Sequence, residues 1–184
     1  MGLTNQEQEL YGNPAWLKAN ILLSQDKYED AAAIIIKLAN NDFVPAQYKL
    51  GILYDYGKGV GQSDTNAFRW YLKAAENGNV DAMNDLAVCY KTGQGCTASL
   101  EKALIWYEKA ALGGNVDAKA NLGINLMSIY KNNRIQLAYQ NQHLIVLKSA
   151  YKWILEAHRA GNIKASQVLP SVLEEMALEG LLNE

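Results

Sequence analysis

The sequence has few of the side chains from which metal centres and catalytic sites are usually built. Its 184 residues contain two cysteines, Cys89 and Cys96, and two histidines, His143 and His158. The histidines lie 15 residues apart, and no arrangement of Cys or Glu around them has the spacing of metal ligands. No nucleophile is paired with a base in a known motif. These absences predict a protein that has no metal, no cofactor and no enzymatic activity.

The chain also has no strong excess of charge and no long apolar run. A formal net charge of −2 and an isoelectric point near 5.7 argue against nucleic-acid binding, which usually needs a basic domain. The longest strongly apolar run, residues 31–36, is far too short to cross a bilayer. Residues 1–12 are polar and show no secretory signal. We therefore expect no membrane insertion and a cytoplasmic location, or a periplasmic one if a signal peptide was removed.

What the sequence does contain is a repeat with a fixed period. Ala46, Ala82 and Ala118 are 36 residues apart, and segment 79–82 returns unchanged as segment 115–118. A period of this length indicates stacked supersecondary units, each of which buries its apolar face against its neighbours. The period therefore predicts a solenoid.

Each unit has the pattern of two helices joined by a glycine-rich loop. Apolar residues recur at three- and four-residue spacing over 46–54 and again over 67–75, so each segment predicts a helix with one apolar face. The glycines of segment 57–61 suit a loop, and Gly59 is expected to adopt a positive φ angle. Alanines let the two helix axes approach closely, and Trp70 is expected to fill the remaining volume.

The third unit carries an insertion. Trp70 lies 24 residues after Ala46, whereas Trp153 lies 35 residues after Ala118, a difference of 11 residues. The extra residues fall at about 131–147. They either form a binding element of their own or lengthen the two helices of that unit.

These boundaries divide the chain into segments of one predicted solenoid domain, 1–184. Pro14 suits the first turn of a helix at the start of an atypical hairpin. A last helix is expected to cover the exposed apolar face at the far end. The predicted segments are the hairpin at 14–45, repeats at 46–81, 82–117 and 118–164, and a cap at 165–184.

The repeated string carries a family resemblance. Its pattern is Ala-x-x-x-Leu-Gly-x-x-Tyr-x-x-Gly-x-Gly-Val and then Ala-x-x-Trp-Tyr-x-x-Ala-Ala-x-x-Gly, which resembles the Sel-one-like repeat, a relative of the tetratricopeptide repeat. The likeness covers about 46–165, and the second unit departs from it at Ala87 and Cys96. It implies an all-α, right-handed α/α solenoid of about four hairpins plus a C-terminal capping helix. It also implies a non-enzymatic scaffold or adaptor that binds another protein or peptide.

The candidate binding residues follow from this resemblance. First helices of successive units line the concave face of tetratricopeptide-like solenoids, so their outward residues are the candidates. Aromatic and adaptable side chains anchor interfaces, which favours Tyr48, Tyr56 and Met127, although any candidate could instead pack against a neighbouring helix. The set consists of Tyr48, Ile52, Asp55, Tyr56, Asn84, Val88, Lys91, Ile124 and Met127, and the insertion adds Arg134, Tyr139 and His143.

Two further functions stay open. Some members of the family are bacterial immunity proteins, which bind and neutralise a cognate toxic effector. Cysteine-rich relatives that bind penicillin-like compounds suggest a hydrolase, but their paired cysteines would stand at Ala75 and Ala82, or at Ala111 and Ala118. The missing pairs argue against the hydrolase and favour a reducing compartment. Of the two thiols, Cys96 in the loop is the better candidate for reactivity.

Overall fold

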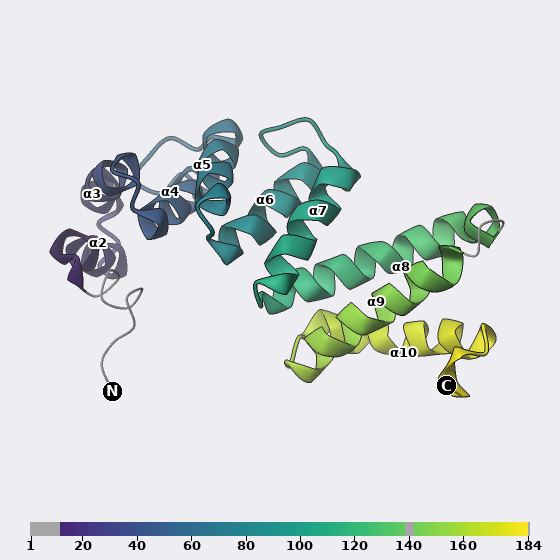
Figure 1. The fold of residues 1–184 in the computed structure, drawn as a ribbon. Helices are drawn as coiled ribbons and strands as arrows, with labels where there is room; N and C mark the ends of the chain where they lie inside the picture. The colour runs from purple at the N-terminus through teal and green to yellow at the C-terminus, as the bar shows by residue number, and fades with distance from the viewer. Residues whose placement is uncertain (1–11, 139–141, 184) are drawn as a thin grey trace. The chain divides into compact units, whose positions relative to one another are not determined.

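The computed structural model describes residues 12–138 and 142–183, and that part of the chain is helical, without a strand (Figure 1). No helix within it has both the length and the apolar character needed to cross a membrane. Consecutive helices pack together in pairs, which confirms an all-α helical-repeat solenoid. The helices are α2 Pro14–Ser24, α3 Tyr28–Asn40, α4 Val44–Tyr56, α5 Asp64–Glu76, α6 Val80–Thr92, α7 Leu100–Leu112, α8 Val116–Ala138, α9 Gln142–Arg159 and α10 Ile163–Leu178, followed by the 3₁₀ turn η1 Leu181–Asn183.

The chain packs as two compact units, which meet in sequence between Ala103 and Leu104, inside α7. In the first unit, helices α2 to α6 pack each on the next along the chain. In the second, α9 packs on both α8 and α10. Small residues let these helices approach: the first core includes Ala31, Ala39 and Ala46, and the second includes Ala150 and Ala157, all fully buried.

A repeated asparagine begins the first helix of each predicted repeat after the first, and it begins α10 as well. Its side-chain oxygen accepts a hydrogen bond from the backbone amide three residues later, an amide that has no partner within the helix. Each cap joins an asparagine to the alanine of the repeated motif: Asn79 to Ala82 at 2.7 Å, Asn115 to Ala118 at 2.7 Å and Asn162 to Ala165 at 3.0 Å. The Asn-x-x-Ala string is therefore a helix start.

The loop glycines fit closely against the preceding hairpin. Gly59 has a φ of 70°, as expected, and a Cβ atom built on it would clash with the carbonyl oxygen of Tyr28 at the start of α3. Gly95, one period later, has a φ of 71°, and its Cβ atom would clash with the carbonyl oxygen of Asp64 at the start of α5. Each loop thus rests on the second helix of the previous hairpin, a contact that only glycine allows.

The aromatic side chain that fills the space between α4 and α5 is Tyr71, so the prediction for Trp70 is wrong. Tyr71 is 3% exposed, and a Cβ atom on Gly51 would lie 2.6 Å from its ring. Trp70 is half-buried at the edge of the first core, with the Lys73 ammonium 5.5 Å from its ring centroid. The two residues are neighbours on a helix, and the rotation between them turns Tyr71 toward α4.

The insertion lengthens helices, which is one of the two outcomes expected. Helices α8 and α9 have 23 and 18 residues, whereas α4, α5, α6 and α7 have 13 each. The long pair packs side by side (Figure 1). The expected capping helix is α10, which contains Pro170 and begins at Ile163.

Candidate functional site: a pocket of tyrosines and aspartates

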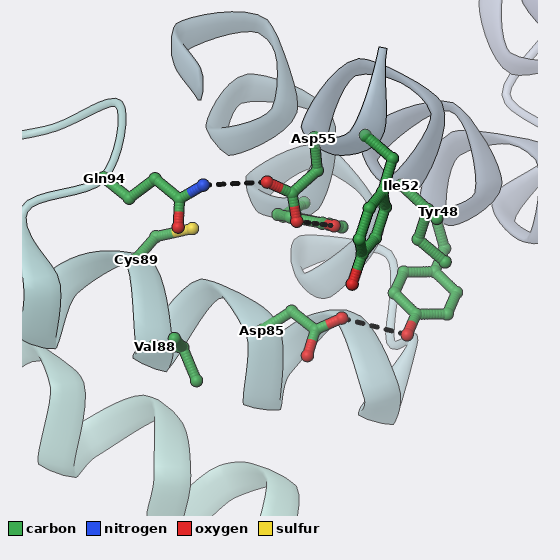
Figure 2. A pocket seen from close by; sticks show the side chains of 9 residues that line it. Tyr48, Ile52, Asp55, Asp85, Val88, Cys89 and Gln94 are labelled. Atoms are coloured by element: carbon green, nitrogen blue, oxygen red, sulfur yellow. Dashed lines mark hydrogen bonds between the residues drawn. The ribbon is translucent and has the colours of Figure 1, made fainter. Parts of the chain in front are cut away.

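A pocket with a volume of about 420 Å³ opens among α4, α5 and α6 of the first unit (Figure 2). Ligand sites are commonly concavities of about 300–1,000 Å³ that combine apolar walls with a few polar groups. This pocket has both kinds of side chain. Its lining consists of Tyr48, Ile52, Asp55 and Tyr56 from α4, Tyr71 from α5, Asp85, Val88 and Cys89 from α6, and Gln94 from the loop that follows.

Helical periodicity explains why α4 offers four of these residues. Tyr48, Ile52, Asp55 and Tyr56 are separated by three or four residues, or adjoin, so they lie on one face of the helix. All four were predicted as candidates, as was Val88, and the structure brings these five to one pocket.

Asp85 lies half-buried on the α6 side of the pocket, and no basic side chain within residues 12–138 and 142–183 forms an ion pair with it. The Tyr48 hydroxyl donates a 2.9 Å hydrogen bond to its Oδ2, and the Asn84 amide donates a 3.2 Å bond to its Oδ1. Burial raises the pKa of the Asp85 carboxyl, and the charges of Asp81 and Asp55 raise it further, whereas the two hydrogen bonds oppose the shift. The site thus holds a carboxylate in an environment that disfavours its negative charge.

Asp55 lies on the α4 side, and the two side chains that donate hydrogen bonds to it are also neutral. The Gln94 amide donates a 2.8 Å hydrogen bond to Oδ1 of Asp55, and the Tyr71 hydroxyl donates a 3.3 Å bond to Oδ2. Figure 2 shows Asp55 and Asp85 coming from different helices around the same space. Burial raises the pKa of both Tyr48 and Tyr71, and the neighbouring carboxylates raise it further, so both hydroxyls keep their protons at neutral pH.

Four lining residues were missed from the sequence: Tyr71, Asp85, Cys89 and Gln94. Tyr71 lies within segment 67–75, which was predicted as a helix, and Gln94 lies in the loop between α6 and α7. Asp85 and Cys89 are four residues apart, with Val88 between them, so they share a face of α6. Asp85 lies three residues before Val88, the candidate that was predicted on this face. A search of the same helix face for polar side chains would therefore have found it.

The other predicted residues lie outside the pocket lining. Asn84 hydrogen-bonds to Asp85 from beside the pocket, and Lys91 is exposed. Ile124 is half-buried on α8 of the second unit. Met127 is 4% exposed and belongs to the core of that unit, so the prediction that it faces outward to a partner is wrong. The reason is that its face of α8 is covered by the core shared with α9 and α10.

Of the three candidates in the insertion, His143 is the one whose side chain is described. Arg134 lies on α8, nothing is described of its side chain, and Tyr139 lies outside the described residues. The side chain of His143 is 14% exposed, with Nε2 3.6 Å from Oε2 of Glu179, beyond the end of α10. His143 therefore packs within the second unit, against its C-terminal part.

Neither thiol is activated. Burial raises the pKa of Cys89 to about 12, and burial also raises the pKa of Cys96. The Cys96 thiol donates a 3.5 Å hydrogen bond to the Cys89 carbonyl oxygen. Within residues 12–138 and 142–183, no cluster of three or more His, Cys, Asp or Glu residues could hold a metal ion. The pocket accordingly offers hydrogen bonding, charge and aromatic surface rather than a nucleophile.

Comparison with known proteins agrees with the repeat pattern. The family model described as the Sel1 repeat matches residues 44–79 and 80–115, which start two residues before the predicted repeats at 46–81 and 82–117. No curated protein sequence matches the chain. The match confirms the resemblance seen in the sequence.

Solved structures show the same fold. A Sel1 repeat protein from Oxalobacter formigenes is 24% identical with a TM-score of 0.60, over 83% of this chain and 73% of that one. The protein c5321, described as a protective antigen of uropathogenic Escherichia coli strains with an SLR fold, is 25% identical with a TM-score of 0.54. That match covers 80% of this chain and 37% of c5321.

Proposed function

We propose that this chain, which contains two Sel1 repeats within a helical solenoid, binds a partner protein through the pocket of α4, α5 and α6. Sel1-repeat proteins generally serve as scaffolds for protein interaction, and they are generally not enzymes. The observation that carries the proposal is the position of the pocket. It lies where the first matched repeat, 44–79, meets the second, 80–115, so both repeats contribute to one binding surface.

The lining has the composition of a protein interface. Tyrosine is enriched at the energetically dominant positions of interfaces, because its ring buries a large area while its hydroxyl hydrogen-bonds. Three tyrosines line the pocket, and the most exposed of them, Tyr56, leaves 68% of its surface accessible. A partner that covers Tyr56 would bury apolar area that the free chain leaves in water.

Two more specific roles, a hydrolase and an immunity protein, were also considered from the sequence. The protonated thiols of Cys89 and Cys96 supply no nucleophile for the hydrolase suggested by cysteine-rich relatives. The immunity role stays a prediction, and an inhibited toxin with a very tight complex would distinguish it from a general scaffold. A reducing compartment also stays a prediction, drawn from the missing cysteine pairs.

Site-specific photocrosslinking tests the proposal. A benzophenone amino acid replaces Tyr56 in one variant and Ile21 in another, since Ile21 is also an exposed apolar residue, on α2, and lies outside the pocket lining. After irradiation in cells, we expect the Tyr56 variant to form one discrete adduct that the Ile21 variant lacks. Mass spectrometry identifies the adduct. Equal adducts from both positions, or an adduct from Ile21 alone, would contradict binding at the pocket.

A further inference from the structure

Neither aspartate of the pocket forms an ion pair with a Lys, Arg or His side chain in the described part of the chain. We infer that the pocket receives an arginine side chain from the partner, an inference that rests on the proposed function. The pocket places Asp55 and Asp85 beside Tyr48, Tyr56 and Tyr71, and its lining contains no lysine, arginine or histidine. Two carboxylates with aromatic walls form a site that is complementary to a flat cation.

The hydrogen bonds around the carboxylates leave room for such a cation. Asp55 accepts from Gln94 and Tyr71, and Asp85 accepts from Tyr48 and Asn84, so every donor is neutral. Among the described residues, no Lys or Arg side chain forms an ion pair with either aspartate. An ionised carboxylate accepts about four hydrogen bonds. Each aspartate therefore keeps acceptor capacity for a donor that comes from outside the chain.

Burial makes an external cation more favourable here than on an open surface. The charge of Asp55 adds to burial in raising the pKa of Asp85, so the two carboxylates repel each other across the pocket. A positive charge between them relieves both the repulsion and the cost of partial desolvation. Exposed pairs such as Lys73 with Asp42 gain little, because water already solvates both charges.

The tyrosines favour guanidinium over ammonium. The rings of Tyr48 and Tyr71 have centroids 6.0 Å apart and an interplanar angle of 45°, and Tyr56 stands exposed at the same pocket. Guanidinium is planar, stacks on aromatic faces and is more weakly hydrated than ammonium, and its five donors can reach two acceptors at once. The hydroxyls of Tyr48 and Tyr71 donate hydrogen bonds to the carboxylates and keep their protons, so the lone pairs on their oxygens can accept from the same cation.

A peptide titration tests this directly. The ¹⁵N-labelled chain is titrated by NMR with acetyl-Gly-Arg-Gly-amide, and with matched peptides that carry lysine or the uncharged isostere citrulline. We expect saturable shifts at Gln94, Val88 and Cys89 with the arginine peptide, at a dissociation constant of about 1 mM, as suits one anchoring side chain. The lysine peptide binds more weakly, and the citrulline peptide weakest.

Variants locate the binding energy. Asp85→Asn and Asp55→Asn each keep an acceptor oxygen and remove the charge, and we expect each to weaken the arginine peptide about tenfold. Asp30→Asn on α3 is the matched control, since Asp30 is exposed outside the lining, and its affinity should equal that of the wild type. Circular dichroism shows whether each variant is folded. The two pocket variants are independent, so one still tests the inference if the other does not fold.

The outcomes separate this inference from the proposed function. Equal binding of arginine and citrulline peptides, tighter binding of lysine, or no shifts at about 10 mM peptide would each overturn the arginine site. A crosslinked partner at Tyr56 together with any of these results would keep the interaction surface and remove only the arginine. Arginine binding without a crosslinked partner would support the cation site and contradict a protein scaffold.

Discussion

Substituting Gly59 with alanine tests the contact between each loop and the preceding hairpin. Two costs arise at this position: a φ of 70°, which residues with a Cβ atom adopt at about 1–2 kcal/mol, and a clash with the backbone of Tyr28. Overpacking of this kind costs about 1–3 kcal/mol, and backbone atoms yield less readily than a flexible side chain. We therefore expect Gly59→Ala to lower the free energy of unfolding by about 2–5 kcal/mol.

Two other glycines separate these costs. Gly78 has a φ of 89° but open space around a built Cβ atom, so Gly78→Ala carries only the conformational cost of about 1–2 kcal/mol. Gly61 has neither a positive φ nor a neighbour within 4 Å, so Gly61→Ala should be neutral or stabilise by up to about 1 kcal/mol. Gly95→Ala, whose Cβ atom would clash with Asp64, should repeat the loss of Gly59→Ala.

Urea unfolding followed by circular dichroism measures all four variants. The four glycines lie in the first compact unit, so the variants report on the same packing. The expected order of stability is Gly61→Ala, then Gly78→Ala, then the Gly59 and Gly95 variants together. Equal losses for Gly59→Ala and Gly78→Ala would refute the reasoning, because the contact with Tyr28 would then contribute nothing beyond the backbone angle.

Other predictions concern the buried tyrosine, the pocket carboxylate and the helix caps. Tyr71→Ala should lower the stability of the fold by about 3–5 kcal/mol, and Trp70→Ala should lower it clearly less, because Tyr71 is 3% exposed and Trp70 is half-buried. Thermal unfolding compares the two variants, and the reverse order would contradict the packing described for α4 and α5. Because the pKa of Asp85 is raised in the fold, its ionisation weakens the folded state as the pH rises from the ordinary value of 3.8 through the raised one. The free energy of unfolding of Asp85→Asn, relative to that of the wild type, should therefore increase between acidic and neutral pH, as measured by urea unfolding. A difference that does not change with pH would contradict a raised pKa of Asp85 in the folded chain. Asn79→Ala should lower stability by about 1 kcal/mol, whereas Asn79→Ser, which can still cap α6, should preserve most of it.

The helices and their ends follow closely from the sequence because their causes are local. The Asn-x-x-Ala caps, the positive φ at Gly59 and the apolar faces with helical spacing involve residues within a few positions of one another. The period of 36 residues adds the stacking, since a repeated face must meet a repeated neighbour. Longer helices in the third unit were also one of the two outcomes expected of the insertion.

Five of the nine residues that line the pocket followed from the sequence. One helix face presents Tyr48, Ile52, Asp55 and Tyr56, and periodicity shows that they lie together. Asp85 reaches the same space from α6, and it bonds to Tyr48 across 37 positions of sequence. Gln94 bonds to Asp55 across 39. Periodicity describes each helix alone, and it does not say which side chains of the next repeat will share a cavity.

The sequence by itself determined that the chain is a stack of helical hairpins and where most helices begin and end, because propensity, capping and glycine conformations act over short distances. Only the tertiary structure decided which neighbour on α5 became the buried aromatic, and that Met127 belongs to a core. It also decided that two carboxylates from adjoining repeats line one pocket whose lining contains no lysine, arginine or histidine. These outcomes depend on the rotation and spacing of packed helices, which place far-apart residues at one point in space.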